Sequence, residues 1–107
     1  MTKQLGKYRS RRIRARIREI LLREWDPIGV RDVAEAQDEY DTYVAKLLVM
    51  LIHERRSADE MAAYLHYIET DYMGLSDVPG VRERCTYVAE LLVKALPALE
   101  AESDDPF

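Results

Sequence analysis

The segment from about residue 39 to residue 56 constrains this sequence most, because apolar side chains cover almost its whole helical circumference. Its apolar positions are Tyr40, Tyr43, Val44, Leu47, Leu48, Met50, Leu51 and Ile52. Only a narrow polar stripe through Thr42, Lys46 and His53 interrupts them. A helix that is apolar nearly all round is surrounded by other elements. The sequence therefore predicts that this helix lies at the centre of the fold.

Three further segments carry apolar side chains at helical spacing, and no run alternates at period two for long enough to predict a strand. The first helix is expected from about Tyr8 to Trp25. Pro27 ends it, because proline disfavours helical geometry in the residue before it. We therefore expect an all-α fold, a compact bundle of four helices with helix two (about 39–56) in the centre.

The third and fourth segments have recognisable ends. The third begins with S-A-D-E at 57–60, which is a capping box, and stops at Gly74. The fourth begins near Pro79 and is expected to end at Pro97. The side chains expected to be buried are Met61, Tyr64, Leu65, Ile68 and Tyr72 in the third segment, and Val81, Cys85, Val88, Leu92 and Leu96 in the fourth.

Length and composition indicate a single globular domain. A chain of 107 residues with 48% hydrophobic and 34% charged residues can bury one core, so we expect one domain over 1–107, with 1–7 and 98–107 flexible. The single cysteine, Cys85, excludes an intramolecular disulfide and favours a reducing compartment. No apolar signal segment follows the basic N-terminus, and the apolar run 47–52 is too short to cross a membrane. We expect a cytoplasmic protein.

The residues that could carry catalysis or bind a metal lack the neighbours that such chemistry requires. His53 begins H-E-R-R-S, which lacks the second histidine of the zinc-binding H-E-x-x-H pattern, and His66 lies beside an apolar stripe. Cys85 lies within an apolar stripe, where a thiol is not activated as a nucleophile. The serines and glycines form no nucleophile elbow and no phosphate-binding loop. We therefore expect no enzyme, no cofactor and no metal site.

The connection between the first two helices, E-W-D-P-I-G-V-R-D-V-A-E-A-Q-D-E-Y-D at 24–41, is rich in carboxylates. Their spacing does not match a calcium-binding EF-hand loop. The favoured interpretation is helix capping, with Asp32 and Glu35, and Asp38 and Asp41, at N-cap to N3 spacing. The alternative is an acidic partner-binding surface, whose members would be Asp26, Asp38, Glu39 and Asp41.

Charge is divided unevenly along the chain. Residues 1–25 hold nine Lys or Arg against two Glu, a net charge of +7, and the remainder carries −11 of the total of −4. An acidic body without a catalytic constellation favours a non-enzymatic protein-interaction module. One such module is a toxin-neutralising immunity protein, whose acidic surface would dock on the basic active-site cleft of a toxin domain. The oligomeric state and the identity of the partner stay open.

The arginine-rich first helix supports an alternative, a nucleic-acid-associated protein. The arginines that could contact phosphates or an acidic partner are Arg9, Arg11, Arg12, Arg14, Arg16 and Arg18. Because they straddle an apolar stripe, they could equally pair with the acidic remainder of the fold. The connection of about a dozen residues to the second helix is too long for a helix-turn-helix. Tyr67 and Tyr87 point away from the apolar stripes of their helices. The favoured interpretation is that they lie at the rim of the core, and the alternative is an exposed aromatic surface.

Two strings resemble a group of small uncharacterised helical bacterial proteins, a domain of unknown function. The strings are W-D-P-I-G-V at 25–30 and D-E-Y-D-T-Y-V at 38–44, and a capped helix ending Y-M-G-L at 72–75 follows them. The resemblance covers about residues 20–96 and implies a small helical fold without a particular activity. Immunity proteins of toxin systems are similar only as a class. The arginine-dense first helix departs from that pattern.

Overall fold

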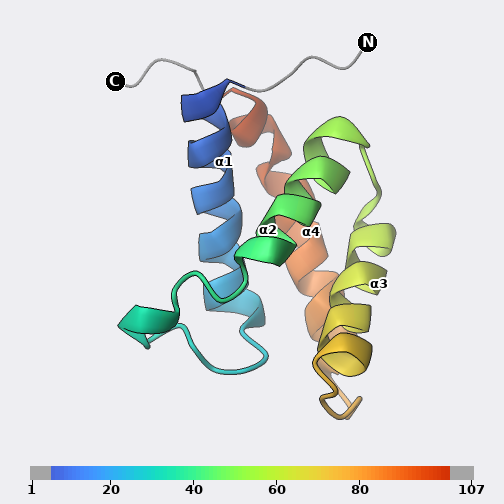
Figure 1. The fold of residues 1–107 in the computed structure, drawn as a ribbon. Coiled ribbons are helices and arrows are strands. Elements are labelled where there is room, and N and C mark those ends of the chain that lie inside the picture. The colour runs from blue at the N-terminus through green and yellow to red at the C-terminus, as the bar shows by residue number, and fades with distance from the viewer. Residues whose placement is uncertain (1–5, 102–107) are drawn as a thin grey trace.

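The computed structural model describes residues 6–101, which contain helices and no strand. Its four α-helices are α1 (Lys7–Ile20), α2 (Asp41–Leu48), α3 (Ala58–Tyr67) and α4 (Val81–Glu100). In Figure 1, α2 runs obliquely between α1 and α3, with α4 behind it. Helix α4 packs against α3 and α1, and α1 also packs against α2. The prediction of an all-α fold with four helices is confirmed.

Three helices continue into a π-helical turn, in which a backbone N–H bonds to the carbonyl five residues earlier. These turns are η1 (Leu21–Trp25) after α1, η3 (Val49–His53) after α2 and η4 (Ile68–Tyr72) after α3. The hydrogen bond that closes each turn is 2.8 Å long, from Asp26 N to Leu21 O, from Glu54 N to Val49 O and from Met73 N to Ile68 O. Each turn is wider than an α-helical one, so it rotates the side chains that follow relative to the helix before it.

The core contains side chains from all four helices. The most deeply buried include Ile13, Ile17, Leu21, Val44, Leu47, Leu51, Met61, Leu65, Cys85, Val88 and Leu92. The predicted stripes of the first, second and fourth helices are therefore largely confirmed. Helix α3 begins at the predicted capping box, in which Glu60 N donates to Ser57 Oγ and Ser57 N donates to Glu60 Oε1, each over 3.1 Å. Gly74, with φ of +72°, follows its end as expected.

The predicted end of the fourth helix is wrong. Pro97 lies inside α4, which continues to Glu100. Leu99 is only 1% exposed, the guanidinium of Arg9 donates to the carbonyl of Glu100 over 2.9 Å, and Arg55 forms a bidentate ion pair with its carboxylate. These contacts hold the last turn despite the backbone N–H that proline lacks. Residues 98–100 thus belong to the helix, Lys7 begins α1, and 1–5 and 102–107 lie outside the described residues.

The prediction that Tyr72 is buried is also wrong, since its side chain is 70% exposed. The π-helical turn η4 is the physical reason, because the wider turn moves Tyr72 off the stripe that Met61 and Leu65 begin. Glu69 points into the core instead and is 3% exposed. The second helix is also shorter than expected, because α2 and η3 together span Asp41 to His53.

Candidate functional site

The connection between α1 and α2 is organised by Asp26, which directly follows η1. Its Oδ1 accepts hydrogen bonds from Val30 N and from the hydroxyl of Tyr40, both over 2.8 Å, and its Oδ2 accepts one from Arg31 N over 3.2 Å. The Tyr40 hydroxyl in turn accepts a hydrogen bond from Ile28 N over 3.3 Å. Asp26 itself has a φ of +35°, which turns the chain out of the helix just before Pro27. The Asp26 carboxylate therefore holds the backbone of this connection next to the buried Tyr40.

The capping interpretation of the other carboxylates is wrong for the N-cap residues Asp32 and Asp38, whereas Glu35 and Asp41 do lie in the first turns of η2 and α2, as expected. The short 3-10 helix η2 (Ala34–Ala36) follows Val33, and α2 follows Tyr40; neither residue caps its helix through its side chain. Asp32 and Asp38 precede those positions, so their spacing to the helix starts differs from the predicted one. The local spacing of carboxylates could not predict these helix starts, because the path of the connection depends on the contact of Asp26 with Tyr40, which is 14 positions away.

The four residues of the predicted acidic surface divide into two pairs. Asp26 is half-buried in the connection, and Asp41 forms two hydrogen bonds with Arg18, from Nε over 2.8 Å and from Nη2 over 2.7 Å. The hydrogen bonds that Arg18 donates to Asp41 are the main reason that the pKa of Arg18 is raised. Asp38 and Glu39 are exposed. Only this second pair is open to a partner without breaking contacts inside the fold.

Four aromatic rings form a continuous series from the core to the surface. Trp25, 2% exposed, lies 5.3 Å from the ring of Tyr40 and 6.1 Å from that of Tyr43, measured between centroids. Tyr43 continues the series to Tyr72, whose ring meets it edge-on at 6.3 Å. Trp25 thus closes the joint between the first two helices against the rings of the second one. The exposed Tyr72 is the outer end of a packed aromatic cluster.

A buried carboxylate fastens the turn that carries Tyr72. Glu69 accepts a hydrogen bond from Trp25 Nε1 over 3.1 Å and another from Arg84 Nη2 over 2.9 Å. The sulfur of Cys85 lies 3.9 Å from the same carboxylate. Burial raises the pKa of the Cys85 thiol to about 11, and the charge of Glu69 acts in the same direction. Glu69 therefore joins η4 to η1 and to α4, three residues before Tyr72.

Sequence reasoning overlooked Glu69, although the signal was present. The residue lies four positions after Leu65 and eight after Met61, which places a carboxylate on the core-facing stripe of its helix. A charged side chain at such a position requires buried hydrogen-bond partners. The single tryptophan was an available donor, but only the fold shows that the two meet.

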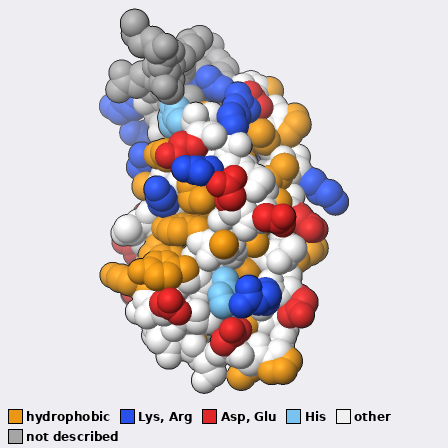
Figure 2. All heavy atoms as spheres, turned by 90° about the vertical axis from the view of Figure 1, so that its right-hand side faces the viewer, with side chains coloured by type: hydrophobic (Ala, Val, Ile, Leu, Met, Phe, Trp, Pro, Cys, Tyr) orange, Lys and Arg blue, Asp and Glu red, His pale blue; other side chains and the backbone are white. Residues whose placement is uncertain are grey.

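We call Tyr43, Tyr64 and Tyr72, together with Glu39, the tyrosine surface. Burial raises the pKa of Tyr43, and Tyr72 and Glu39 raise it further. Burial also raises the pKa of Tyr64, and Tyr43 adds to this effect. Within this surface the rings of Tyr43 and Tyr72 are in direct contact, with their centroids 6.3 Å apart. Figure 2 shows hydrophobic side chains gathered on the α3 side of the molecule, with charged side chains around them.

Exposed tyrosines occur elsewhere as well. Tyr67 on α3 and Tyr87 on α4 are 53% and 51% exposed, which supports the alternative of an exposed surface over the favoured position at the rim of the core. Among the described residues neither ring packs against another aromatic ring. They differ in this respect from Tyr72, whose ring is held in place.

The structure divides the six arginines of the first helix. Arg11, Arg14 and Arg16 are exposed. Arg9, Arg12 and Arg18 are half-buried and already have partners, among them the carbonyl of Glu100 for Arg9 and Asp41 for Arg18. The two alternatives for these arginines, internal pairing and ligand contact, therefore apply to different members of the set.

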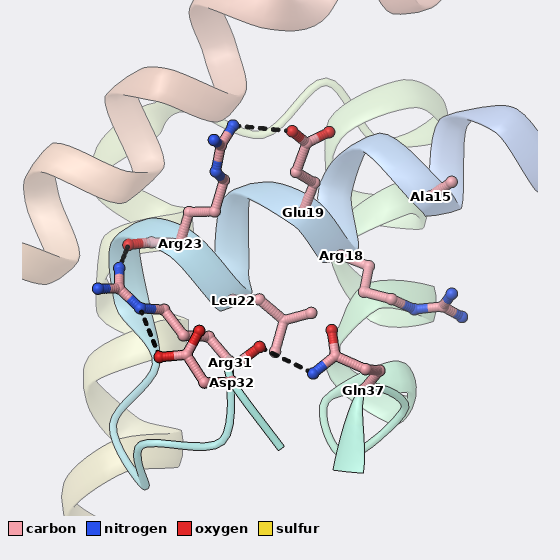
Figure 3. Close-up of a pocket in the computed structure, with 8 residues that line it drawn as sticks. All are labelled: Ala15, Arg18, Glu19, Leu22, Arg23, Arg31, Asp32 and Gln37. Atoms are coloured by element: carbon pink, nitrogen blue, oxygen red, sulfur yellow. Dashed lines mark hydrogen bonds and ion pairs between the residues drawn. The ribbon is translucent and has the colours of Figure 1, made fainter. Parts of the chain in front are cut away.

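A groove of about 540 Å³ lies between α1 and the connection that follows it (Figure 3). Its lining residues are Ala15, Arg18, Glu19, Leu22, Arg23, Arg31, Asp32 and Gln37. Each of its three arginines has a carboxylate partner: Arg18 pairs with Asp41, Arg23 with Glu19 over 2.9 Å, and Arg31 with Asp32 over 3.9 Å. Because these charges are matched, the groove has little free charge with which to bind a ligand. We therefore favour the tyrosine surface as the binding site.

No group of three or more His, Cys, Asp or Glu side chains within residues 6–101 could hold a metal ion. His66 Nε2 lies 3.0 Å from Asp77 Oδ1, and His53 ends η3.

None of the helices in the described part of the chain is long and apolar enough to span a membrane.

Comparisons with protein-family models, with curated proteins and with solved structures give no match to this chain. The resemblance through W-D-P-I-G and D-E-Y-D therefore stays a prediction. In the fold, the residues of these strings form the joint itself: Trp25 packs in the aromatic cluster, Asp26 accepts the hydrogen bond of Tyr40, and Asp41 pairs with Arg18. The strings thus describe how two helices are connected.

Proposed function

We propose that this protein is a non-enzymatic interaction module that binds a basic protein through the tyrosine surface. The observation that carries this proposal is Tyr72, which is 70% exposed and yet packs edge-on against Tyr43. Tyrosine provides a large amphipathic contact area and loses little conformational entropy on binding. A ring that is already held in place loses still less, which favours binding affinity.

The charge next to these rings supports a basic partner. Glu39 belongs to the tyrosine surface, and the exposed Asp38 precedes it in the chain. The acidic surface proposed here is smaller than the sequence suggested. Asp26 and Asp41 are not part of it, because they form hydrogen bonds and an ion pair inside the fold. Exposed charges at the rim of an interface speed association and select the partner, and buried aromatic rings at its centre supply most of the affinity.

The form of this function that we propose is toxin neutralisation in the cytoplasm. An immunity protein acts by covering the active-site cleft of its toxin, and clefts that bind nucleic acid are basic. An aromatic surface with exposed carboxylates beside it complements such a cleft in charge. The single, deeply buried cysteine is compatible with a reducing compartment.

The experiment that tests this function uses the protein encoded by the adjacent open reading frame as the probe. The two proteins are expressed together and separately, and growth of the cells and co-purification of the pair are measured. We expect the neighbour to arrest growth when it is expressed alone, and to form a stable, harmless complex with this chain. A neighbour that is harmless alone, or that does not bind, would contradict the toxin-neutralising form.

A further inference from the structure

One face of α1 carries three cations that no carboxylate of the described chain neutralises. Lys7, Arg11 and Arg14 follow one another at i, i+4 and i+7, which aligns them along the helix. All three are exposed, and none forms an ion pair within residues 6–101. The guanidinium of Arg11 lies 5.9 Å from the centre of the Tyr8 ring, a contact that orients this charge and leaves it positive. We call these three residues the basic stripe.

A surface hollow lies along the basic stripe and is lined by its three side chains. It has a volume of about 390 Å³ and is lined by Gly6, Lys7, Ser10, Arg11 and Arg14. Seven residues of α-helix rise by about 10 Å, so the three charges are spread over a distance that spans several phosphates of one nucleic-acid strand. The hydroxyl of Ser10 adds a neutral donor of the kind that contacts phosphate oxygens.

We infer that the basic stripe binds the phosphate backbone of nucleic acid without preference for base sequence. Phosphate contacts by Lys and Arg carry no sequence information, and the hollow has no Asn or Gln to read adenine and no Asp or Glu to read cytosine. Arg9, Arg12 and Arg18 take no part, because they are half-buried and already have partners. This activity lies beyond the proposed function and uses another element, since Figure 1 shows the beginning of α1 at the top of the molecule and the end of α3 near the bottom.

The test is fluorescence anisotropy with a labelled 20-base-pair DNA duplex of mixed sequence, titrated with the full chain at several salt concentrations. Three phosphate contacts give a slope of log affinity against log salt of about −2.7. We expect the Arg11→Ala/Arg14→Ala variant to reduce the magnitude of this slope by about 1.8 and to weaken binding at low salt at least tenfold. A duplex of different sequence should bind equally well.

Arg14→Ala and Arg16→Ala form a matched pair, because both arginines are exposed on α1 and Arg16 borders a different hollow, shared with Leu91 and Lys94 of α4. Arg16→Ala should leave the salt slope unchanged. Equal losses in the two variants would show general charge attraction and overturn the inference, as would the absence of duplex binding at 25 mM salt. Binding to anionic lipid vesicles in place of DNA would also overturn it. Tyr72→Ala should bind DNA normally, so this result is independent of the protein partner.

Discussion

Trp25 and Glu69, 44 positions apart in the sequence, are joined by a hydrogen bond of 3.1 Å from the indole Nε1 to a carboxylate oxygen. Within residues 6–101, Glu69 is the only charged residue that is buried. Arg84 provides its counter-charge from the half-exposed edge of α4. A buried carboxylate is stable only when such partners satisfy it. The pair therefore holds the ends of α1 and α3 together, and with them the rings of the tyrosine surface.

Removing the Glu69 carboxylate should destabilise the whole fold. Glu69→Ala leaves the Trp25 indole and the Arg84 guanidinium without their acceptor, and we expect it to lower the free energy of unfolding by about 2–4 kcal/mol. Urea denaturation followed by fluorescence measures this directly, because Trp25 is the single tryptophan. Glu69→Gln keeps an acceptor for the indole and should cost less. A loss below about 1 kcal/mol in the alanine variant would show that the hydrogen bond is not important for stability.

The Asp26–Tyr40 hydrogen bond should stabilise the connection between α1 and α2. We expect Tyr40→Phe to cost about 1–2 kcal/mol, because it leaves the carboxylate and Ile28 N without the hydroxyl. A double-mutant cycle with Asp26→Asn should give a coupling energy of about 1 kcal/mol. Tyr67→Phe is the matched control, since that exposed hydroxyl forms no hydrogen bond with the described residues, and it should change stability by less than about 0.5 kcal/mol. Independent, additive effects of the two substitutions would contradict the assignment.

The stability of the protein should fall at alkaline pH. Burial raises the pKa of Cys85 from 9.0 to about 11 and raises the pKa values of Tyr43 and Tyr64 above 10.0. Above pH 9 the unfolded chain therefore releases protons that the folded chain still holds, which favours unfolding. We expect the free energy of unfolding to be constant between pH 7 and 8.5 and to decrease from pH 9 to 11. Cys85→Ala should flatten the first part of this decrease, and an unchanged profile in that variant would contradict the role of the thiol.

Much of the fold could be predicted from local patterns. The four helices follow from the spacing of apolar residues, the start of α3 from Ser57 and Glu60, and the burial of Cys85 from its place on an apolar stripe. Each of these depends on residues within a few positions of one another. The end of α4 could not be predicted in this way, because contacts from Arg9 and Arg55, far away in the sequence, keep Pro97 inside a helix.

The candidate site was harder to predict for the same reason. The position of Tyr72 depends on the π-helical turn η4, which tertiary packing selects and which no local pattern in residues 68–72 indicates. The exposure of Tyr67 and Tyr87 matches the alternative that the sequence favoured less, and neither ring packs in the aromatic cluster. Of the predicted acidic residues, Asp26 was overlooked as the organiser of the connection, because its partner Tyr40 is 14 positions away.

The affinity of the purified chain for the product of the adjacent open reading frame, measured by calorimetry, tests the proposed function most directly. We expect Tyr72→Ala to raise the Kd at least about thirtyfold, as for a central interface residue. Glu39→Lys should raise the Kd as well, because the reversed charge slows association with a basic partner. Two control variants should each change the Kd by less than about threefold. Tyr87→Ala removes another exposed tyrosine, from α4, and Asp41→Asn removes a charge that is paired with Arg18. A Kd for Tyr72→Ala within threefold of the wild-type value, or an equal loss in Tyr87→Ala, would contradict binding through the tyrosine surface.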